Sequence, residues 1–266
     1  MMLDLRKIFK LLNGVLVALV SVFSAPAGAD NAAQLQQIDA AYDAGDYSQV
    51  VRLLQPFAQQ GNVDAQYNLG VMYLDGKGVA QNYKQAMVWF QKAAQQGDVG
   101  AQYSLGVMYR DGKGVKRDYK QAMAWFQKAA NQGSSMAQLN LGGMYKEGQG
   151  VAKDDKQAVA WFKKAANQSN PLAQFNLGNM YRTGQGVAQD DKQAVAWYQK
   201  AAHQGLADAQ NNLGNMYANG KGVVQDYQQA KAWWQKVLAQ PDTPDNAQAK
   251  AAARIGLQQL KNRGVR

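Results

Sequence analysis

The sequence contains no cysteine and only one histidine. The lack of cysteine excludes disulfide bridges, a thiol nucleophile and thiolate metal ligands. The one histidine, His203, has no acid or nucleophile at a spacing that suggests a general base, so we interpret it as an exposed residue near a helix end. The sequence therefore offers no cluster of metal ligands and no recognisable catalytic group.

Long apolar runs are also scarce. The mostly apolar stretch 11–23 follows three basic residues and precedes a run of small residues at 27–29. This order predicts a secretory signal peptide over 1–29, cleaved before Asp30. The alternative is an uncleaved membrane anchor, but the run is short for a spanning helix and is interrupted at Asn13. We expect an exported chain, periplasmic or secreted, with no stable membrane span after cleavage.

Acidic residues are outnumbered by basic ones. The chain carries a formal charge of +10, and residues 1–29 hold three basic residues and one acidic residue, which leaves +8 on the remainder. A positive balance favours an anionic envelope polymer, such as peptidoglycan or lipopolysaccharide, as one possible partner. Nucleic acid is not expected as a partner, because an exported chain is directed away from it.

What the sequence has in abundance is a 36-residue repeat. One pattern starts again at each of five positions: Ala65, Ala101, Ala137, Ala173 and Ala209. A fixed period of this size is typical of a solenoid built from supersecondary units. We divide the array into five repeats: 62–97, 98–133, 134–169, 170–205 and 206–240.

Each repeat is expected to form two helices, as repeat 2 illustrates. Asp98 is a good N-cap for a first helix, which ends at the paired glycines Gly112 and Gly114. Asp118 and Gln121 then form a capping-box pattern for a second helix. The paired glycines lack the G-x-x-x-x-G-K-[ST] pattern of a phosphate-binding loop, so we interpret them as helix-ending turns. In repeat 5 Leu206 occupies the first cap position, which predicts a looser or shifted helix start there.

A glycine also recurs inside every first helix. Interior glycine costs a helix about 0.5–1 kcal/mol relative to alanine. Its return in every repeat predicts that a neighbouring helix crosses too closely for a Cβ atom. The five positions are Gly70, Gly106, Gly142, Gly178 and Gly214.

Aromatic residues form two further rows, one on each helix of the repeat. They could make an aromatic binding surface, but recurrence at a fixed offset is what packing between repeats demands, so we interpret both rows as core. The tryptophan row is Trp89, Trp125, Trp161, Trp197 and Trp233. The tyrosine row is Tyr73, Tyr109, Tyr145, Tyr181 and Tyr217.

These motifs resemble the Sel-1-like repeat family, which is related to the tetratricopeptide repeats. The matching elements are A-Q-x-x-L-G-x-M-Y, G-x-G-V and D-x-x-Q-A-x-x-W-[FYW]-x-K-A-A, and they cover about 65–238. The resemblance implies an all-α fold, a right-handed α-solenoid of antiparallel helix pairs, and a function as an adaptor for other proteins. Cysteine-rich relatives have been linked to β-lactam binding or hydrolysis, but this chain lacks both the cysteines and an S-x-x-K motif.

The sequence predicts that the two segments that flank the array are its terminal caps. Residues 30–61 are expected to form an N-terminal helix pair in which Pro56 kinks or limits the second helix. Residues 241–266 are expected to form a C-terminal cap with one helix over 245–261. Terminal repeats of a solenoid are usually atypical because one of their faces meets water.

Variable positions on the first helices are the candidate binding residues. In tetratricopeptide-like folds the equivalent offsets line an inner groove, and asparagine side chains there can pair with an extended peptide backbone, while basic residues suit carboxylates. The alternative is ordinary solvated helix surface. The predicted groove residues are Tyr67, Tyr103, Arg110, Asn140, Lys146, Phe175, Asn176, Asn179, Arg182, Asn212 and Asn215.

The function that this pattern favours is a non-enzymatic scaffold of the bacterial envelope. It would bind a protein or an extended peptide in its groove, and it needs no cofactor and no metal. Two alternatives stay open: a basic binder of anionic envelope polymers and, with less support, a β-lactam-interacting hydrolase.

Overall fold

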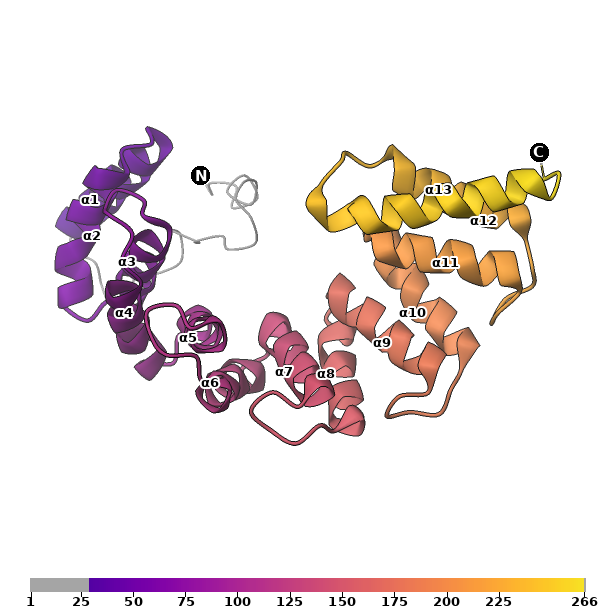
Figure 1. The fold of residues 1–266 in the computed structure, drawn as a ribbon. Coiled ribbons are helices and arrows are strands. Elements are labelled where there is room, and N and C mark those ends of the chain that lie inside the picture. The colour runs from indigo at the N-terminus through magenta and orange to yellow at the C-terminus, as the bar shows by residue number, and fades with distance from the viewer. Residues whose placement is uncertain (1–28, 266) are drawn as a thin grey trace. The chain divides into compact units, whose positions relative to one another are not determined.

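The computed structural model describes residues 29–265, so the predicted signal peptide falls almost entirely outside the described residues. Within this range the structure is all-α, with thirteen α-helices, one short 3-10 helix and no strand (Figure 1). None of the helices in the described range is long and apolar enough to cross a membrane.

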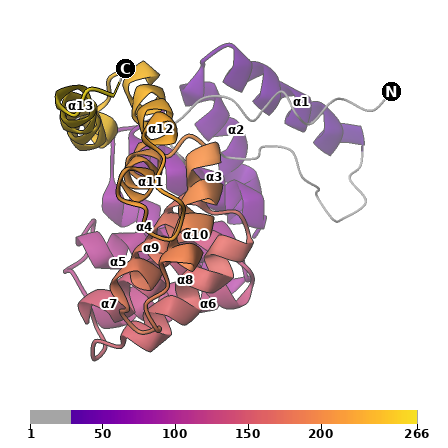
Figure 2. The same cartoon turned by 90° about the vertical axis from the view of Figure 1, so that its right-hand side faces the viewer.

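The helices follow one another in pairs along the chain, and Figure 2 shows them from a second direction. The first two are α1 (Ala29–Asp43) and α2 (Tyr47–Gln59). The array consists of α3 (Val63–Asp75), α4 (Tyr83–Gln95), α5 (Val99–Asp111), α6 (Tyr119–Asn131), α7 (Ser135–Glu147), α8 (Asp155–Asn167), α9 (Pro171–Thr183), α10 (Asp191–His203), α11 (Ala207–Asn219) and α12 (Tyr227–Ala239). The chain ends with η1 (Pro244–Asn246) and α13 (Ala247–Asn262). It divides between Ala129 and Ala130 into two compact bodies.

The expected caps fix where the helices begin. The Asp98 Oδ1 atom accepts a hydrogen bond from the Ala101 backbone N–H at 2.6 Å, and Asn170 caps α9 in the same way. At the start of α11 Leu206 makes no capping hydrogen bond, yet the helix begins in the same register as its equivalents. The expected shift is therefore absent. Leu206 packs instead against the apolar cluster that contains Tyr198.

The paired glycines end the first helices, as expected. Gly112 has φ +72° and Gly114 has φ +74°, a left-handed conformation that favours glycine. A Cβ atom on Gly114 would also lie 2.7 Å from the Tyr83 carbonyl carbon. The valine that follows, Val115, packs into the core. This turn thus brings the chain back against the preceding repeat.

The interior glycines make room for an aromatic ring rather than for a helix backbone. A Cβ atom on Gly106 would lie 2.5 Å from Cδ1 of Phe126, which projects from the second helix of the same repeat. The prediction of a close neighbour is confirmed, but the neighbour is a side chain. The five rings are Phe90, Phe126, Phe162, Tyr198 and Trp234.

Buried glutamines tie consecutive repeats together. The Gln174 side chain is only 3% exposed, and its Nε2 atom donates to the Ala166 carbonyl at 3.2 Å. Its Oε1 atom accepts from the Gln204 side chain at 2.8 Å. The equivalent buried glutamines are Gln66, Gln102, Gln138 and Gln210. This repeated bond satisfies polar groups that would otherwise be buried without a partner.

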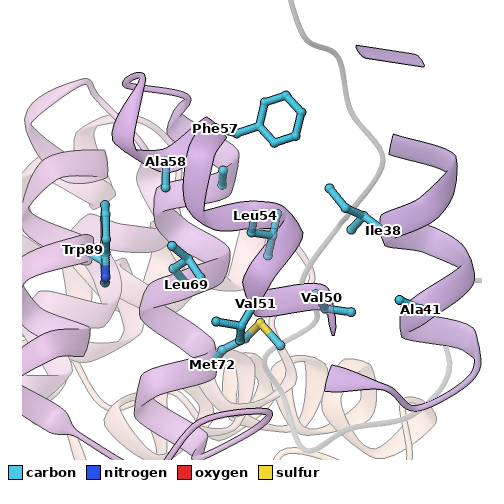
Figure 3. Packing of buried hydrophobic residues seen from close by; sticks show 11 residues of the cluster. Ile38, Ala41, Val50, Val51, Leu54, Phe57, Ala58, Leu69, Met72 and Trp89 are labelled. Carbon is cyan, nitrogen blue, oxygen red and sulfur yellow. The ribbon is translucent and has the colours of Figure 1, made fainter. Parts of the chain in front are cut away.

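The first body has an apolar core to which α1, α2, α3 and α4 contribute (Figure 3). Ile38 comes from α1, Leu54 from α2, Leu69 from α3 and Trp89 from α4. Pro56 lies inside α2, which continues beyond it to Gln59. Proline therefore does not end this helix at its own position.

In the second body α13 packs against α11 and α12. Ala253 and Leu260 from α13 share an apolar cluster with Trp234 and Val237 from α12. A Cβ atom on Gly256 would lie 2.6 Å from the Trp234 ring. A helix lies at the position expected from the sequence, and it covers the ring of the last repeat.

The tryptophan row is largely core, as predicted. Trp89, Trp161 and Trp233 are each 8% exposed. Every tryptophan of the row also carries a lysine ammonium over its ring, at 3.9–4.2 Å from the ring centroid. These lysines are exposed to solvent.

Candidate functional site

Two aromatic residues of the predicted groove, Tyr67 and Tyr103, lie in the first body and contact the interior rings. Tyr67 contacts Phe90 and Tyr103 contacts Phe126, each pair with ring centroids 5.7 Å apart and planes inclined by 46°. Both tyrosines are half-buried. Burial, followed by the charge of Asp98, raises the pKa of Tyr67 to about 12. The two rings therefore add a second aromatic layer above the core.

Two of the three predicted basic residues already have an acidic partner. The Arg110 Nε atom lies 2.7 Å from Asp111 Oδ1, and the Lys146 Nζ atom lies 3.1 Å from Glu147 Oε1. In both cases the acid is the next residue in the chain. Each acid competes with an external anion for its base.

Arg182 is different because Thr183 takes the place of the acid. The Thr183 hydroxyl is uncharged, and it donates to the backbone carbonyl of Asn179 at 2.8 Å rather than pairing with the guanidinium. Arg182 is exposed and has no carboxylate within 4.0 Å among the residues that the structure describes. Its Nε atom donates instead to the Tyr198 hydroxyl at 3.2 Å.

The buried residue Tyr198 bonds two of the side chains at this surface. It occupies the position that holds phenylalanine in repeats 1 to 3, and it is completely buried. Its hydroxyl donates to Asn179 Oδ1 at 2.6 Å, and Asn212 Nδ2 approaches the same oxygen at 3.5 Å. Phe175 lies against its ring, with centroids 5.9 Å apart. We refer to Phe175, Asn179, Arg182, Tyr198 and Asn212 as the Arg182 cluster.

The charges of the Arg182 cluster act on the tyrosine as well. Burial raises the pKa of Tyr198, while the hydrogen bond and the positive charge of Arg182 oppose the rise. The hydroxyl therefore stays protonated at neutral pH, and it donates to Asn179 while it accepts from Arg182. These two bonds hold both side chains in one arrangement.

The remaining predicted residues have varied surroundings. Asn140 Nδ2 donates to the Met136 backbone carbonyl at 2.8 Å, within its own helix. Asn176 is half-buried and Asn215 is exposed. Their role in holding a peptide backbone stays a prediction.

Sequence reasoning missed Tyr198, although a signal was present. Tyrosine replaces phenylalanine only in repeat 4, and in the same repeat Thr183 replaces the acid found at Asp111 and Glu147. Each substitution looks minor alone. Together they leave a guanidinium without an acid and give it a buried hydroxyl to bond.

Repeat 5 varies the same position in another way. Trp234 carries the interior ring, and its Nε1 atom is buried without a hydrogen-bond partner. Asn211, at the position of Phe175, is 9% exposed, and its Oδ1 atom also lacks a partner. These two polar atoms reduce stability unless something else satisfies them.

The described residues contain no group of three or more histidine, cysteine, aspartate and glutamate side chains that could hold a metal ion. An exposed guanidinium, amide groups and a half-buried ring can bind a carboxylate and the chain that carries it.

Comparison with known proteins agrees with this architecture. The Sel1 repeat model matches residues 63–98, 99–134, 135–170, 171–206 and 207–240. A solved Escherichia coli structure, described as a protective antigen present in uropathogenic strains and displaying an SLR fold, is 36% identical with a TM-score of 0.75. That match covers 86% of this chain and 53% of the other, so this chain spans about half of that relative.

A second solved structure, a Sel1 repeat protein from Oxalobacter formigenes, is 31% identical with a TM-score of 0.71. The match covers 82% of this chain and 98% of that one. No curated protein matches the chain. The chain belongs to the Sel1 repeat family.

Proposed function

We propose that this protein is a non-enzymatic scaffold that binds a protein or peptide partner on the exposed face of its first helices. The observation that supports this most is the Arg182 cluster. Its guanidinium is exposed, lacks an acidic partner among the described residues and is bonded to a buried hydroxyl. Such a group costs little to organise when a partner binds.

The proposed location is the bacterial envelope, and it depends on the signal peptide predicted for residues 1–29. Fractionation of cells that produce the full chain tests this. Cleaved protein in the periplasm or the medium would support the location, and uncleaved protein in the cytoplasm would contradict it.

Partner binding is tested by comparing the mature protein with a variant of the face, Asn176→Ala/Asn179→Ala/Arg182→Ala. Both are used as bait in envelope extract, after circular dichroism has shown equal helix content. The control is Lys163→Ala, which removes one exposed charge from α8. We expect one protein to be retained by the mature protein and the control but lost by the triple variant. Retention by all three would place binding elsewhere on the molecule.

A second candidate, binding of an anionic polymer, draws support from the exposed lysines that lie over the tryptophan rings. Contacts between exposed charges weaken steeply with salt. Binding of purified peptidoglycan or lipopolysaccharide that disappears at high salt, and that survives the triple substitution, would favour this candidate over the first.

A further inference from the structure

The Arg182 cluster differs from the equivalent positions in the partner of its basic side chain. In repeats 2 and 3 the equivalent base is paired with the following acid, at 2.7 Å and 3.1 Å. In repeat 4 the Arg182 Nε atom is bonded to a neutral hydroxyl, and among the described residues no acid neutralises the guanidinium. The guanidinium of this repeat therefore has no salt-bridge partner within 4.0 Å among the described residues.

One hydrogen bond restrains the orientation of that charge. The bond from Nε to Tyr198 leaves both Nη groups of Arg182 without a partner among the described residues. Two parallel N–H donors match the two oxygens of a carboxylate, and a guanidinium held in place loses less entropy when it binds. The site is therefore prepared for a planar anion.

The neighbours of the guanidinium indicate how a ligand would continue. Asn179 uses its Oδ1 atom to accept from Tyr198 and Asn212, and its Nδ2 group has no hydrogen-bond partner among the described residues. Phe175 offers a half-buried ring that lies against Tyr198. Further amides belong to the same two helices, Asn176 to α9 and Asn215 to α11. Amides on two successive first helices suit a chain that passes through, rather than one that ends there.

We propose that the Arg182 cluster is the subsite that binds an aspartate or glutamate side chain within an extended peptide segment of the partner, with Arg182 as the carboxylate ligand and Tyr198 as the residue that positions it. This inference rests on the proposed function and names the chemistry of its partner. Charge complementarity selects the acidic side chain, and the flanking amides select an internal residue over a chain terminus.

The test is a selection of binders from a random peptide library displayed with its carboxyl end fused to the carrier. The baits are the mature protein, Arg182→Gln, Tyr198→Phe and, as a control, Lys163→Gln. We expect one acidic position to be enriched with the mature protein and with Lys163→Gln, and this enrichment to vanish with Arg182→Gln. Binders without an acidic position would overturn the inference and leave the proposed function standing. No binders at all would count against both.

A synthetic peptide from that selection distinguishes binding of an acidic side chain from binding of the carboxyl end of the peptide. Replacement of its acidic residue by the matching amide should weaken binding at least about tenfold, because charge-assisted hydrogen bonds are lost. Amidation of its carboxyl end should change nothing. The reverse result would show that the cluster binds a chain terminus and would contradict the inference.

Tyr198→Phe distinguishes positioning from structural support. Phenylalanine fills the same place in repeats 1 to 3, so the fold should be retained. We expect this variant to lose about threefold or more of the preference for the acidic peptide over the amide-containing peptide, because Arg182 is no longer held by the hydroxyl. Equal weakening toward both peptides would indicate damage to the fold and would argue against a positioning role.

Discussion

Two adjacent glycines in α7 show how residue environment decides the effect of one methyl group. A Cβ atom on Gly142 would lie 2.5 Å from the Phe162 ring, whereas a Cβ atom on Gly143 would meet nothing within 4 Å. Gly142→Ala should lower the free energy of unfolding by about 1–3 kcal/mol through overpacking. Gly143→Ala should raise it by about 0.5–1 kcal/mol, because alanine favours the helix. Urea denaturation of both variants measures this, and effects of the same sign would refute the packing role of Gly142.

Ser169 adopts φ +63°, the one non-glycine residue with positive φ in the described chain. Its equivalents in repeats 1, 2 and 4 are glycine, and Gly205 in the same body has φ +87° with nothing within 4 Å of its Cβ position. Ser169→Gly should raise the free energy of unfolding by about 1 kcal/mol, since an L side chain is strained in this region. Gly205→Ser should lower it by a similar amount. Thermal denaturation of the two variants should show shifts in opposite directions.

Tyr67 gives a pH dependence at the residue scale. Its pKa is raised from 10.0 to about 12 in the folded chain, first by burial and then by Asp98. A raised pKa means that the folded state holds the proton more tightly, so the associated stability is present below pH 10 and is lost as pH rises toward 12. Stability measured across this range should fall more steeply for the natural chain than for Tyr67→Phe. Identical slopes would show that the phenol titrates normally.

At the scale of elements, the glutamine bonds couple one repeat to the next. Gln174→Ala should lower the free energy of unfolding by about 1–3 kcal/mol, because Gln174 is buried and bonds both Ala166 and Gln204. Gln204→Ala removes one partner from an exposed position and should cost less than about 1 kcal/mol. The double variant should cost less than the two single effects combined, since the side chains share a bond. Strict additivity would mean that the bond contributes nothing.

The elements themselves could be foreseen from the sequence, because caps and apolar spacing act locally. Asp98 and Asn170 begin helices where their side chains predict, and the paired glycines end them. The partner of the interior glycines could not be foreseen. A recurring glycine indicates that another group lies close to it, but it does not show whether that group is a helix backbone or a side chain such as the ring of Phe126.

The candidate site was foreseen only in part, for a related reason. Arg110, Lys146 and Arg182 share one offset in the repeat, so the pattern treats them alike. Their partners differ in the structure, because Arg110 and Lys146 are followed by an acid whereas Arg182 is followed by Thr183 and bonds the Tyr198 hydroxyl. Such differences depend on rotamers and on contacts between helices, which a periodic pattern does not contain.

At the scale of the whole molecule, an array of repeats leaves an apolar face at its end that something must cover. In the second body α13 does this for repeat 5: Trp234 is 2% exposed and Val237 is fully buried beneath it. Polar contacts hold the segment in place, since Lys250 bonds the Gln240 carbonyl and the Asp242 carboxylate. The Arg263 side chain donates to the Tyr227 hydroxyl at 3.0 Å.

A chain that ends at Gln240 should therefore expose the apolar face of α12. Loss of burial costs about 1.5–3 kcal/mol for each large apolar side chain, so the last repeat should unfold more easily. The uncovered face should also promote association between molecules. Sedimentation velocity and urea denaturation test both effects, with a chain that ends at Arg263 as the control that keeps α13. If the shorter chain stays monomeric and as stable as the control, then α13 is not the cap of the array, and the apolar contacts around Trp234 contribute little to its stability.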